Sequence, residues 1–239
     1  MPLHFKHCAV FLLASLLVAF SSFAQPKGDG KFNFSKLVDL DVKMKTETKV
    51  IGNDGVIRTT FLEEHFVRKG SAAWVERIVP SIVPAKKKSK SGSDHQHFDP
   101  LEGARLVEME KGQLRLSFLQ HDEKVRVGIP KSEFQSIGFD GSWERAYYMM
   151  TPQEYAALKP TSRGTTIANT QWYEGDDKEN YLRILVDFNN AIPLLIERGN
   201  FIGTRSHKTT LMPQTLKDMP KEWKNINTYT PKVYSDFVD

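Results

Sequence analysis

The sequence predicts a mostly β protein of the α+β class: a curved antiparallel sheet, or unclosed half-barrel, of about ten strands with two or three short helices. Three observations lead to this prediction. Apolar and polar residues alternate with a period of two in one segment after another, short turns rich in Gly, Asn and Asp separate these segments, and signals for helices are few. Links as short as these connect antiparallel neighbours by default.

The first predicted strand begins at Leu40. Its even positions up to Val50 are apolar or small and polar, whereas its odd positions are charged, which indicates a strand with one buried face. The turn over residues 52–55, Gly-Asn-Asp-Gly, then favours a hairpin, because these residue types tolerate a positive φ. Further strands are predicted, in order, over residues 56–68, 72–79, 104–110, 113–119, 125–129, 165–173, 181–188, 192–198 and 203–211.

The clearest helix signal lies in residues 151–154, Thr-Pro-Gln-Glu. Thr151 can cap the helix, the proline suits the first helical position, and Glu154 completes a capping box. The helix should continue to about Leu158, because Pro160 cannot extend it. Shorter helical segments are predicted over residues 131–136 and 220–226.

Residues 1–24 have the pattern of a secretory signal peptide. Lys6 precedes the apolar run 8–20, and the small residues Ser22 and Ala24 stand before the expected cleavage site. The apolar run is too short to span a bilayer, so we expect cleavage rather than a membrane anchor.

Cleavage would leave residues 25–239 as a single β-rich domain in the periplasm. The only cysteine, Cys8, would be lost, so this domain could have neither a disulfide nor a thiolate metal site. An exported domain of this size without disulfides suits a bacterial periplasm. The composition, 40% hydrophobic and 26% charged, is that of an ordinary soluble globular protein.

Residues 84–100 are predicted to form a flexible loop between strands. The loop contains four lysines, Lys86, Lys87, Lys88 and Lys90, and the simplest interpretation is a solvated surface segment. If the lysines have a function, contact with an anionic phospholipid surface suits the compartment best. A net charge of only +4 argues against a nucleic-acid-binding protein.

The same loop contains a His-x-His motif. In an extended segment His95, His97 and Asp99 project to one side, and these residue types ligate zinc or copper(II). The alternative is a pair of histidines that are exposed to solvent or hydrogen-bonded to their neighbours. A closed metal site needs a further ligand, and the other histidines of the domain are His65, His121 and His207.

The sequence lacks catalytic signatures. It contains neither Gly-x-Ser-x-Gly nor His-Glu-x-x-His. The acid pairs Glu63-Glu64 and Asp176-Asp177 are adjacent, so on a strand their side chains would point to opposite faces and could not act together as general acid and base. We therefore expect no enzymatic activity and no cofactor.

Aromatic residues are spread over many of the predicted strands and turns. A single curved sheet has two faces, and a hollow face lined by aromatic and aliphatic side chains could hold a ligand. The alternative is a plain packed core, which periodicity does not distinguish from such a cavity. The aromatic residues predicted to bind the ligand are Phe61, Trp74, Phe118, Trp143 and Trp172.

Three segments together resemble a known family. They are the hairpin 40–68, the strand 74–77 (Trp-Val-Glu-Arg), and the late hairpin 185–197 (Leu-Val-Asp-Phe-Asn-Asn-Ala-Ile-Pro-Leu-Leu-Ile-Glu), which is followed by Gly203. The chain resembles LolA-like and LolB-like lipoprotein carriers and the N-terminal domain of RseB-type envelope sensors. This resemblance implies an unclosed antiparallel half-barrel with a helical lid, whose hollow face binds acyl chains or lipoprotein tails.

Together these observations favour a non-catalytic periplasmic carrier or sensor that binds an apolar ligand, either a lipid or an acylated protein, on its concave face. Two alternatives stay open. One is a metal-binding periplasmic protein that uses His95, His97 and Asp99, and the other is a structural partner in an envelope complex that uses exposed sheet edges.

Overall fold

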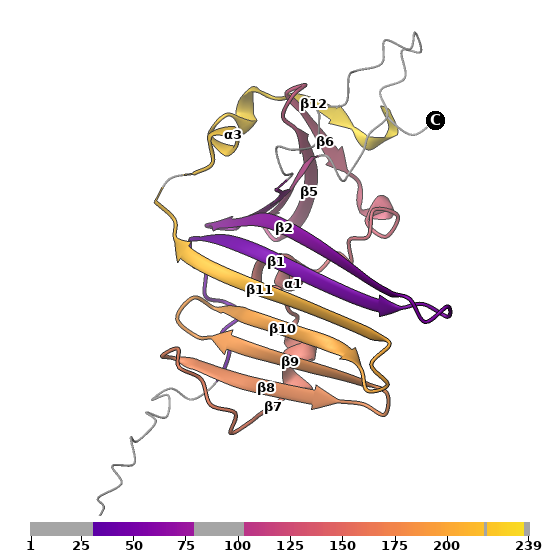
Figure 1. Cartoon of the computed structure of the whole chain (residues 1–239). Coiled ribbons are helices and arrows are strands. Elements are labelled where there is room, and N and C mark those ends of the chain that lie inside the picture. The colour runs from indigo at the N-terminus through magenta and orange to yellow at the C-terminus, as the bar shows by residue number, and fades with distance from the viewer. Residues whose placement is uncertain (1–30, 79–102, 218, 237–239) are drawn as a thin grey trace, which may run out of the picture.

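The computed structural model describes residues 31–78, 103–217 and 219–236 (Figure 1). The predicted signal peptide, 1–24, and the predicted loop 84–100, with its lysines and its His-x-His motif, lie outside the described residues. Within the described part of the chain, no helix is both long and apolar enough to cross a membrane.

Twelve strands form one unclosed sheet, in the order β12-β6-β5-β4-β3-β2-β1-β11-β10-β9-β8-β7. Neighbours run antiparallel, except that β12 runs parallel to β6. The edge strands β7 and β12 lie at opposite ends of the molecule (Figure 1). The predicted mostly β, antiparallel, unclosed sheet is confirmed. The strands are β1 (Leu40–Ile51), β2 (Ile57–Lys69), β3 (Ala72–Arg77), β4 (Ala104–Glu110), β5 (Gln113–Gln120), β6 (Val125–Ile129), β7 (Lys159–Pro160), β8 (Thr170–Asp176), β9 (Asn180–Asp187), β10 (Ile192–Asn200), β11 (Arg205–Thr215) and β12 (Thr230–Val233).

The strand predicted over residues 165–173 begins later, at Thr170. The hydroxyl group of Thr170 donates a hydrogen bond to the main-chain oxygen of Ile167, at 2.7 Å, and lies 2.8 Å from the hydroxyl group of Thr165. Such local side-chain hydrogen bonds compete with strand pairing. Residues 165–169, which the sequence pattern included in the strand, therefore form a turn instead.

Three short α-helices complete the described fold: α1 (Trp143–Tyr148), α2 (Pro152–Ala156) and α3 (Lys221–Lys224). The predicted capping box of α2 is present: the hydroxyl of Thr151 accepts from the Glu154 amide at 3.1 Å, and the Glu154 carboxylate accepts from the Thr151 amide at 2.9 Å. The sequence did not predict α1. This helix has only six residues, too few for a helical period to be recognised.

One face of the sheet packs against α1, and we call it the inner face. The turn after β1 contains Gly55 at φ 73°, and it sets a register in which Val42 pairs with Phe66 and Thr46 with Leu62. Even-numbered residues of β1 and β2 therefore share the inner face, and odd-numbered residues share the outer face.

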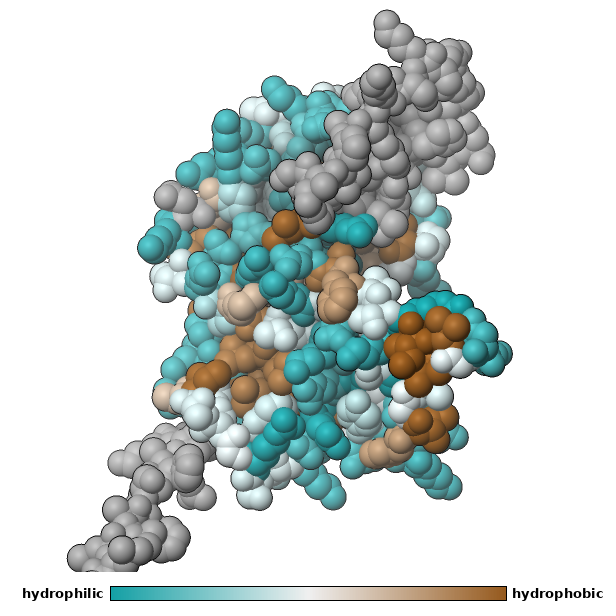
Figure 2. Space-filling model, viewed as in Figure 1, coloured by the Kyte–Doolittle hydropathy of each residue, from teal (hydrophilic) through white to brown (hydrophobic). Residues whose placement is uncertain are grey.

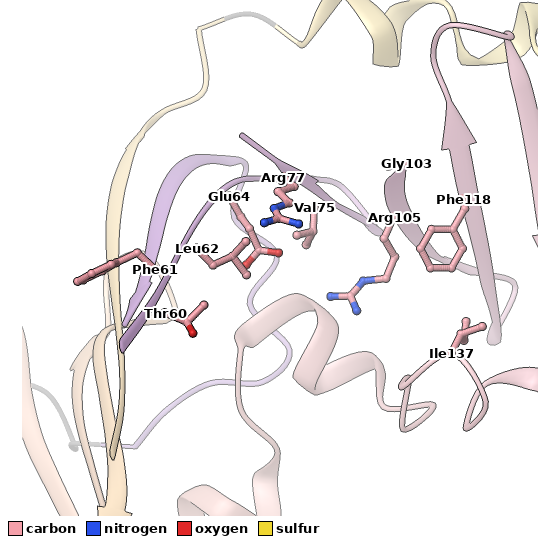
Figure 3. Close-up of a pocket in the computed structure, with 10 residues that line it drawn as sticks. All are labelled: Thr60, Phe61, Leu62, Glu64, Val75, Arg77, Gly103, Arg105, Phe118 and Ile137. Carbon is pink, nitrogen blue, oxygen red and sulfur yellow. The ribbon is translucent and has the colours of Figure 1, made fainter. Parts of the chain in front are cut away.

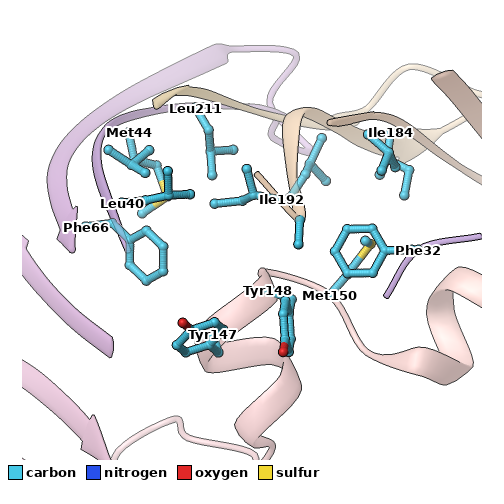
Figure 4. Close-up of a cluster of buried hydrophobic side chains, with 14 of the residues drawn as sticks. Phe32, Leu40, Met44, Phe66, Tyr147, Tyr148, Met150, Ile184, Ile192 and Leu211 are labelled. Atoms are coloured by element: carbon cyan, nitrogen blue, oxygen red, sulfur yellow. The ribbon is translucent and has the colours of Figure 1, made fainter. Parts of the chain in front are cut away.

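The largest apolar core lies between the inner face and α1 (Figure 4). Tyr147 and Tyr148 of α1 meet side chains from β1, β2, β9, β10 and β11, and Phe32 joins them from the segment before β1. Burial of these side chains, at about 25 cal/mol per Å² of apolar surface, is the main force that holds α1 on the sheet.

A second apolar cluster lies on the outer face around Trp74, which is fully buried. Trp223, from α3, stacks on Trp74 with the ring centroids 5.4 Å apart, and His121 stacks on Trp74 at 5.5 Å. The Nδ1 atom of His121 lies 2.8 Å from the hydroxyl group of Tyr229. Trp223 and Tyr229 of the C-terminal segment thus pack on the outer face, whereas Tyr234 packs against the inner-face cluster that contains Phe118.

Candidate ligand-binding site

The inner face is hollowed between β2–β5 and the segment that leads into α1. The first hollow has a volume of about 390 Å³. Figure 3 shows side chains from the sheet on one side of it and Ile137 on the other. The lining residues are Thr60, Phe61, Leu62, Glu64, Val75, Arg77, Gly103, Arg105, Phe118 and Ile137.

A second hollow of about 380 Å³ adjoins the first, because Leu62, Glu64 and Arg105 line both. It lies between β1, β2, β10 and β11 on one side and the segment that contains α1 on the other. Its further lining residues are Met44, Thr46, Gly138, Phe139, Asp140, Arg145, Ala146, Met149, Ile196, Arg198, His207 and Thr209. We refer to the two adjoining hollows together as the central hollow.

A larger hollow of about 1060 Å³ lies toward the free ends of the β1–β2 and β10–β11 hairpins, and we call it the tip hollow. It shares Arg198 and His207 with the central hollow. Exposed apolar side chains gather at the ends of these two hairpins (Figure 2). They are Val50, Ile51, Val56, Ile57, Phe201 and Ile202.

Charged groups meet apolar ones in the central hollow. Burial raises the pKa of the Glu64 carboxyl group, although the positive charges of Arg105 and Arg77 oppose this shift. Burial also lowers the pKa of the Arg105 guanidinium. The Nε atom of Arg105 is buried and has no hydrogen-bond partner among the described residues. The Arg105 guanidinium is therefore incompletely satisfied by the described residues that surround it.

The wall formed by α1 is fixed by ion pairs. Arg145 lies 2.5 Å from Asp140, which precedes α1, and 2.9 Å from Glu154 in α2. Arg145 thus connects the turn before α1 to α2. Because two carboxylates neutralise the Arg145 guanidinium, this side chain holds the wall of the hollow in place and adds no free positive charge to the hollow.

His207 stands where the central hollow meets the tip hollow. Its ring nitrogens lie 3.0 Å from the hydroxyl group of Thr48 and 3.2 Å from that of Thr209. Burial, and then the positive charge of Arg198, lower the pKa of the imidazole. The neutral ring is therefore favoured at this position.

The structure places the five predicted ligand-binding aromatic residues in different surroundings. Phe118 lines the central hollow. Trp143 packs between the core around Tyr147 and a further apolar cluster that contains Phe118. Phe61 lies at the edge of the first hollow, but its ring points away from it (Figure 3) and is largely exposed. Trp74 is buried on the outer face. Trp172 also lies on the outer face, where the guanidinium of Arg163 stacks 3.7 Å from its ring centroid.

Sequence reasoning missed Leu62, Glu64 and Arg105, which join the two parts of the central hollow. The signal for Leu62 and Glu64 was present in the sequence. The hairpin turn carries the even-numbered face of β1 onto the even-numbered face of β2, so Leu62 and Glu64, rather than Phe61, belong to the inner face. Arg105 could not be assigned in this way, because the long link between β3, which ends at Arg77, and β4, which begins at Ala104, fixes no register in the sequence.

The predicted metal ligands His95, His97 and Asp99 lie outside the described residues. Among the residues that the structure describes, no group of three or more His, Cys, Asp or Glu side chains could hold a metal ion. His65 pairs with Asp41 at 2.8 Å, and His121 lies 3.3 Å from Glu76. Metal binding by the loop stays a prediction.

The fold and the site together define a class: an unclosed, single-sheet β protein with a hollowed inner face under a short helix. A comparison with protein-family profiles finds no match, and no curated protein sequence is significantly similar.

Solved structures similar to this chain include a DUF1329 family protein from Desulfovibrio piger, at 8% identity and a TM-score of 0.38, over 82% of this chain and 93% of that one. An uncharacterised conserved protein from Thermus thermophilus is similar at 10% identity and a TM-score of 0.35, over 80% and 90% of the two chains. PNGF-II is similar at 10% identity and a TM-score of 0.38, over 83% of this chain and 33% of its own.

Proposed function

We propose that this protein is a non-catalytic periplasmic carrier or sensor that binds an acyl chain, of a lipid or of an acylated protein, in the central hollow. One observation carries the proposal: two adjoining hollows lie between the inner face and the segment 137–149, which contains α1, and Leu62 lines both. Apolar side chains reach them from the sheet, at Val75 and Phe118, and from the opposite side, at Ile137 and Met149. A flexible apolar chain could therefore contact both walls at once.

The expected affinity follows from the apolar surface that is buried. Each methylene group that leaves water contributes about 0.8 kcal/mol, so eight buried methylenes contribute about 6 kcal/mol. Immobilising the ligand opposes this gain. A gain of about 6 kcal/mol corresponds to a dissociation constant on the order of 10⁻⁵ M, so a chain with eight buried methylenes is expected to bind no more tightly than this.

Native mass spectrometry of protein purified from a periplasmic extract tests the proposal first. We expect a lipid-sized mass that remains bound under native conditions and is lost on mild denaturation. We also expect delipidated protein to bind a fluorescent fatty acid. Delipidated protein that binds no acyl chain at any accessible concentration would contradict the proposed function.

Filling the hollow provides the matched test. Leu62→Trp introduces a bulky ring between the two parts of the central hollow and should weaken acyl binding at least tenfold. Thr59→Trp is the control, because Thr59 lies on the same strand but on the exposed outer face, opposite Lys49. If both variants bind the fatty acid as the wild type does, the ligand does not occupy the central hollow.

The proposed compartment has its own test. The N-terminus of the protein recovered from the periplasm should be Gln25, as expected after signal-peptide cleavage. Recovery of the whole chain with its first residues intact, in the cytoplasm, would contradict periplasmic export.

A further inference from the structure

We propose that the central hollow binds the acidic head group of its ligand through Arg105 and Arg77, so that the ligand is an anionic amphiphile. This inference rests on the proposed function and adds the chemical class of the ligand. A carboxylate and a phosphate monoester share the chemistry that two guanidinium groups recognise.

The register of the sheet brings the two arginines together. Glu64 of β2 pairs with Arg77 of β3, and Val75, two residues before Arg77, pairs with Arg105 of β4. Residues that pair across strands project from the same face. Both arginines and Glu64 therefore project from the inner face, and Figure 3 shows the three side chains extending into one space.

The charges in this space do not balance. Glu64 acts on both arginines through its charge alone, since within the described residues it forms an ion pair with neither. Asp140 also acts on Arg105, but its carboxylate is paired with Arg145. Two guanidinium groups face the single carboxyl group of Glu64, so positive charge is in excess among these three side chains, and burial further disfavours the ionised form of the carboxyl group. Other arginines of the fold differ, since Arg126 pairs with Glu108 and Arg145 pairs with two carboxylates.

Arg105 also retains an unused donor. Its Nε atom is buried with no hydrogen-bond partner among the described residues. A buried donor of this kind costs about 1–3 kcal/mol until it is satisfied. An anion seated beside Arg105 would accept from this donor and offset the excess charge.

The surroundings of Arg105 accommodate the rest of an amphiphile. Phe118 pairs with Arg105 across β4 and β5, and Val75 pairs with it across β3 and β4. Leu62 continues the apolar lining into the second hollow. An acidic head at Arg105 and Arg77 thus places the acyl chain along apolar side chains.

The test compares palmitic acid, palmityl alcohol and a monoacyl phosphate of the same chain length on delipidated full-length exported protein. We expect the two acids to bind at least tenfold more tightly than the alcohol. Arg105→Met should weaken binding of both acids at least tenfold and change alcohol binding less than twofold. Arg115→Met, on the exposed part of β5, is the control and should change neither.

Arg77→Met provides a second variant in case Arg105→Met does not fold, as judged by circular dichroism, and it should show the same selective loss. Acids and alcohol that bind equally to the wild type would overturn the inference while leaving the proposed function intact. A loss that is equal for acids and alcohol in both variants would also overturn it.

Competition with inorganic phosphate tests for a free anion. If phosphate displaces the acids at micromolar concentration, the site binds a free anion, which contradicts an amphiphilic ligand. If none of the three lipids binds, the proposed function itself fails.

Discussion

The guanidinium group of Arg68 on β2 donates a hydrogen bond to the main-chain oxygen of Tyr147 in α1, at 3.1 Å. The same group donates to the main-chain oxygens of Ala191, at 3.0 Å, and of Asn190 in the turn between β9 and β10. It also lies 4.7 Å from the centroid of the Tyr147 ring. Burial lowers the pKa of Arg68 to about 10, so the side chain stays charged at neutral pH. One buried cation therefore joins the sheet, α1 and a distant turn, and it fixes α1 relative to the sheet.

Arg68→Met should destabilise the protein by about 3 kcal/mol, because two buried carbonyl groups and one partly buried carbonyl group lose charge-assisted donors. Denaturant unfolding followed by circular dichroism measures this change. Arg115→Met, at an exposed arginine, serves as the control and should shift stability by less than about 0.5 kcal/mol. Equal stability of wild type and Arg68→Met would mean that α1 does not depend on this contact.

Tyr148→Phe should raise the free energy of unfolding by about 1 kcal/mol. The Tyr148 side chain is fully buried, and its hydroxyl group has no hydrogen-bond partner among the described residues. Burial raises its pKa to about 12. Removing the oxygen therefore removes a desolvation cost while keeping the ring contacts with Phe32 and Phe34. A clear loss of stability in thermal unfolding would show that this hydroxyl is satisfied in solution.

His207→Gln should remove part of the dependence of stability on pH. The pKa of His207 is lower in the folded protein than its ordinary value, so the unfolded chain binds the proton more readily. The free energy of unfolding of the wild type should therefore fall as the pH drops through about 6.5, and level off below the folded-state pKa. Unfolding measured between about pH 8 and pH 5 should show a shallower decline for the variant. Parallel curves for the two proteins would argue against a lowered pKa at His207.

Trp223→Ala should loosen the C-terminal segment on the outer face and leave the inner core unchanged. The variant loses the stacked contact of this half-buried ring with Trp74, and an aromatic pair of this kind contributes about 1 kcal/mol. Hydrogen exchange should become faster in α3 and β12, whereas exchange in β1 and β11 should be unaffected. Unchanged exchange in α3 would contradict a role for the Trp74–Trp223 contact in holding this segment.

Much of the fold follows from local patterns in the sequence. Alternation from Leu40 and the Gly-Asn-Asp-Gly turn predict the β1–β2 hairpin, and the capping box from Thr151 predicts the start of α2. The edge strands β7 and β12 could not be predicted, because they are two and four residues long and have no period of their own. Helix α1 is hidden for a related reason, since its place is set by Arg68 and by long-range packing.

The candidate site was less predictable than the fold. Aromatic content singled out Trp74 and Trp172, yet the register places both on the outer face, where the C-terminal segment and Arg163 cover them. The hollow depends instead on Leu62 and Arg105, which are ordinary strand residues in the sequence. Only pairing across strands far apart in the chain brings them together.

Photo-crosslinking tests the central claim most directly. A palmitic acid analogue with a diazirine group in its acyl chain would be bound to the delipidated protein, irradiated, and located by peptide mass spectrometry. The account predicts labels on β2 near Leu62 and on the segment that contains Ile137 and Met149, and their loss in Leu62→Trp. Labels confined to the outer face, or no labelling at saturating ligand, would contradict the central hollow as the acyl-chain site.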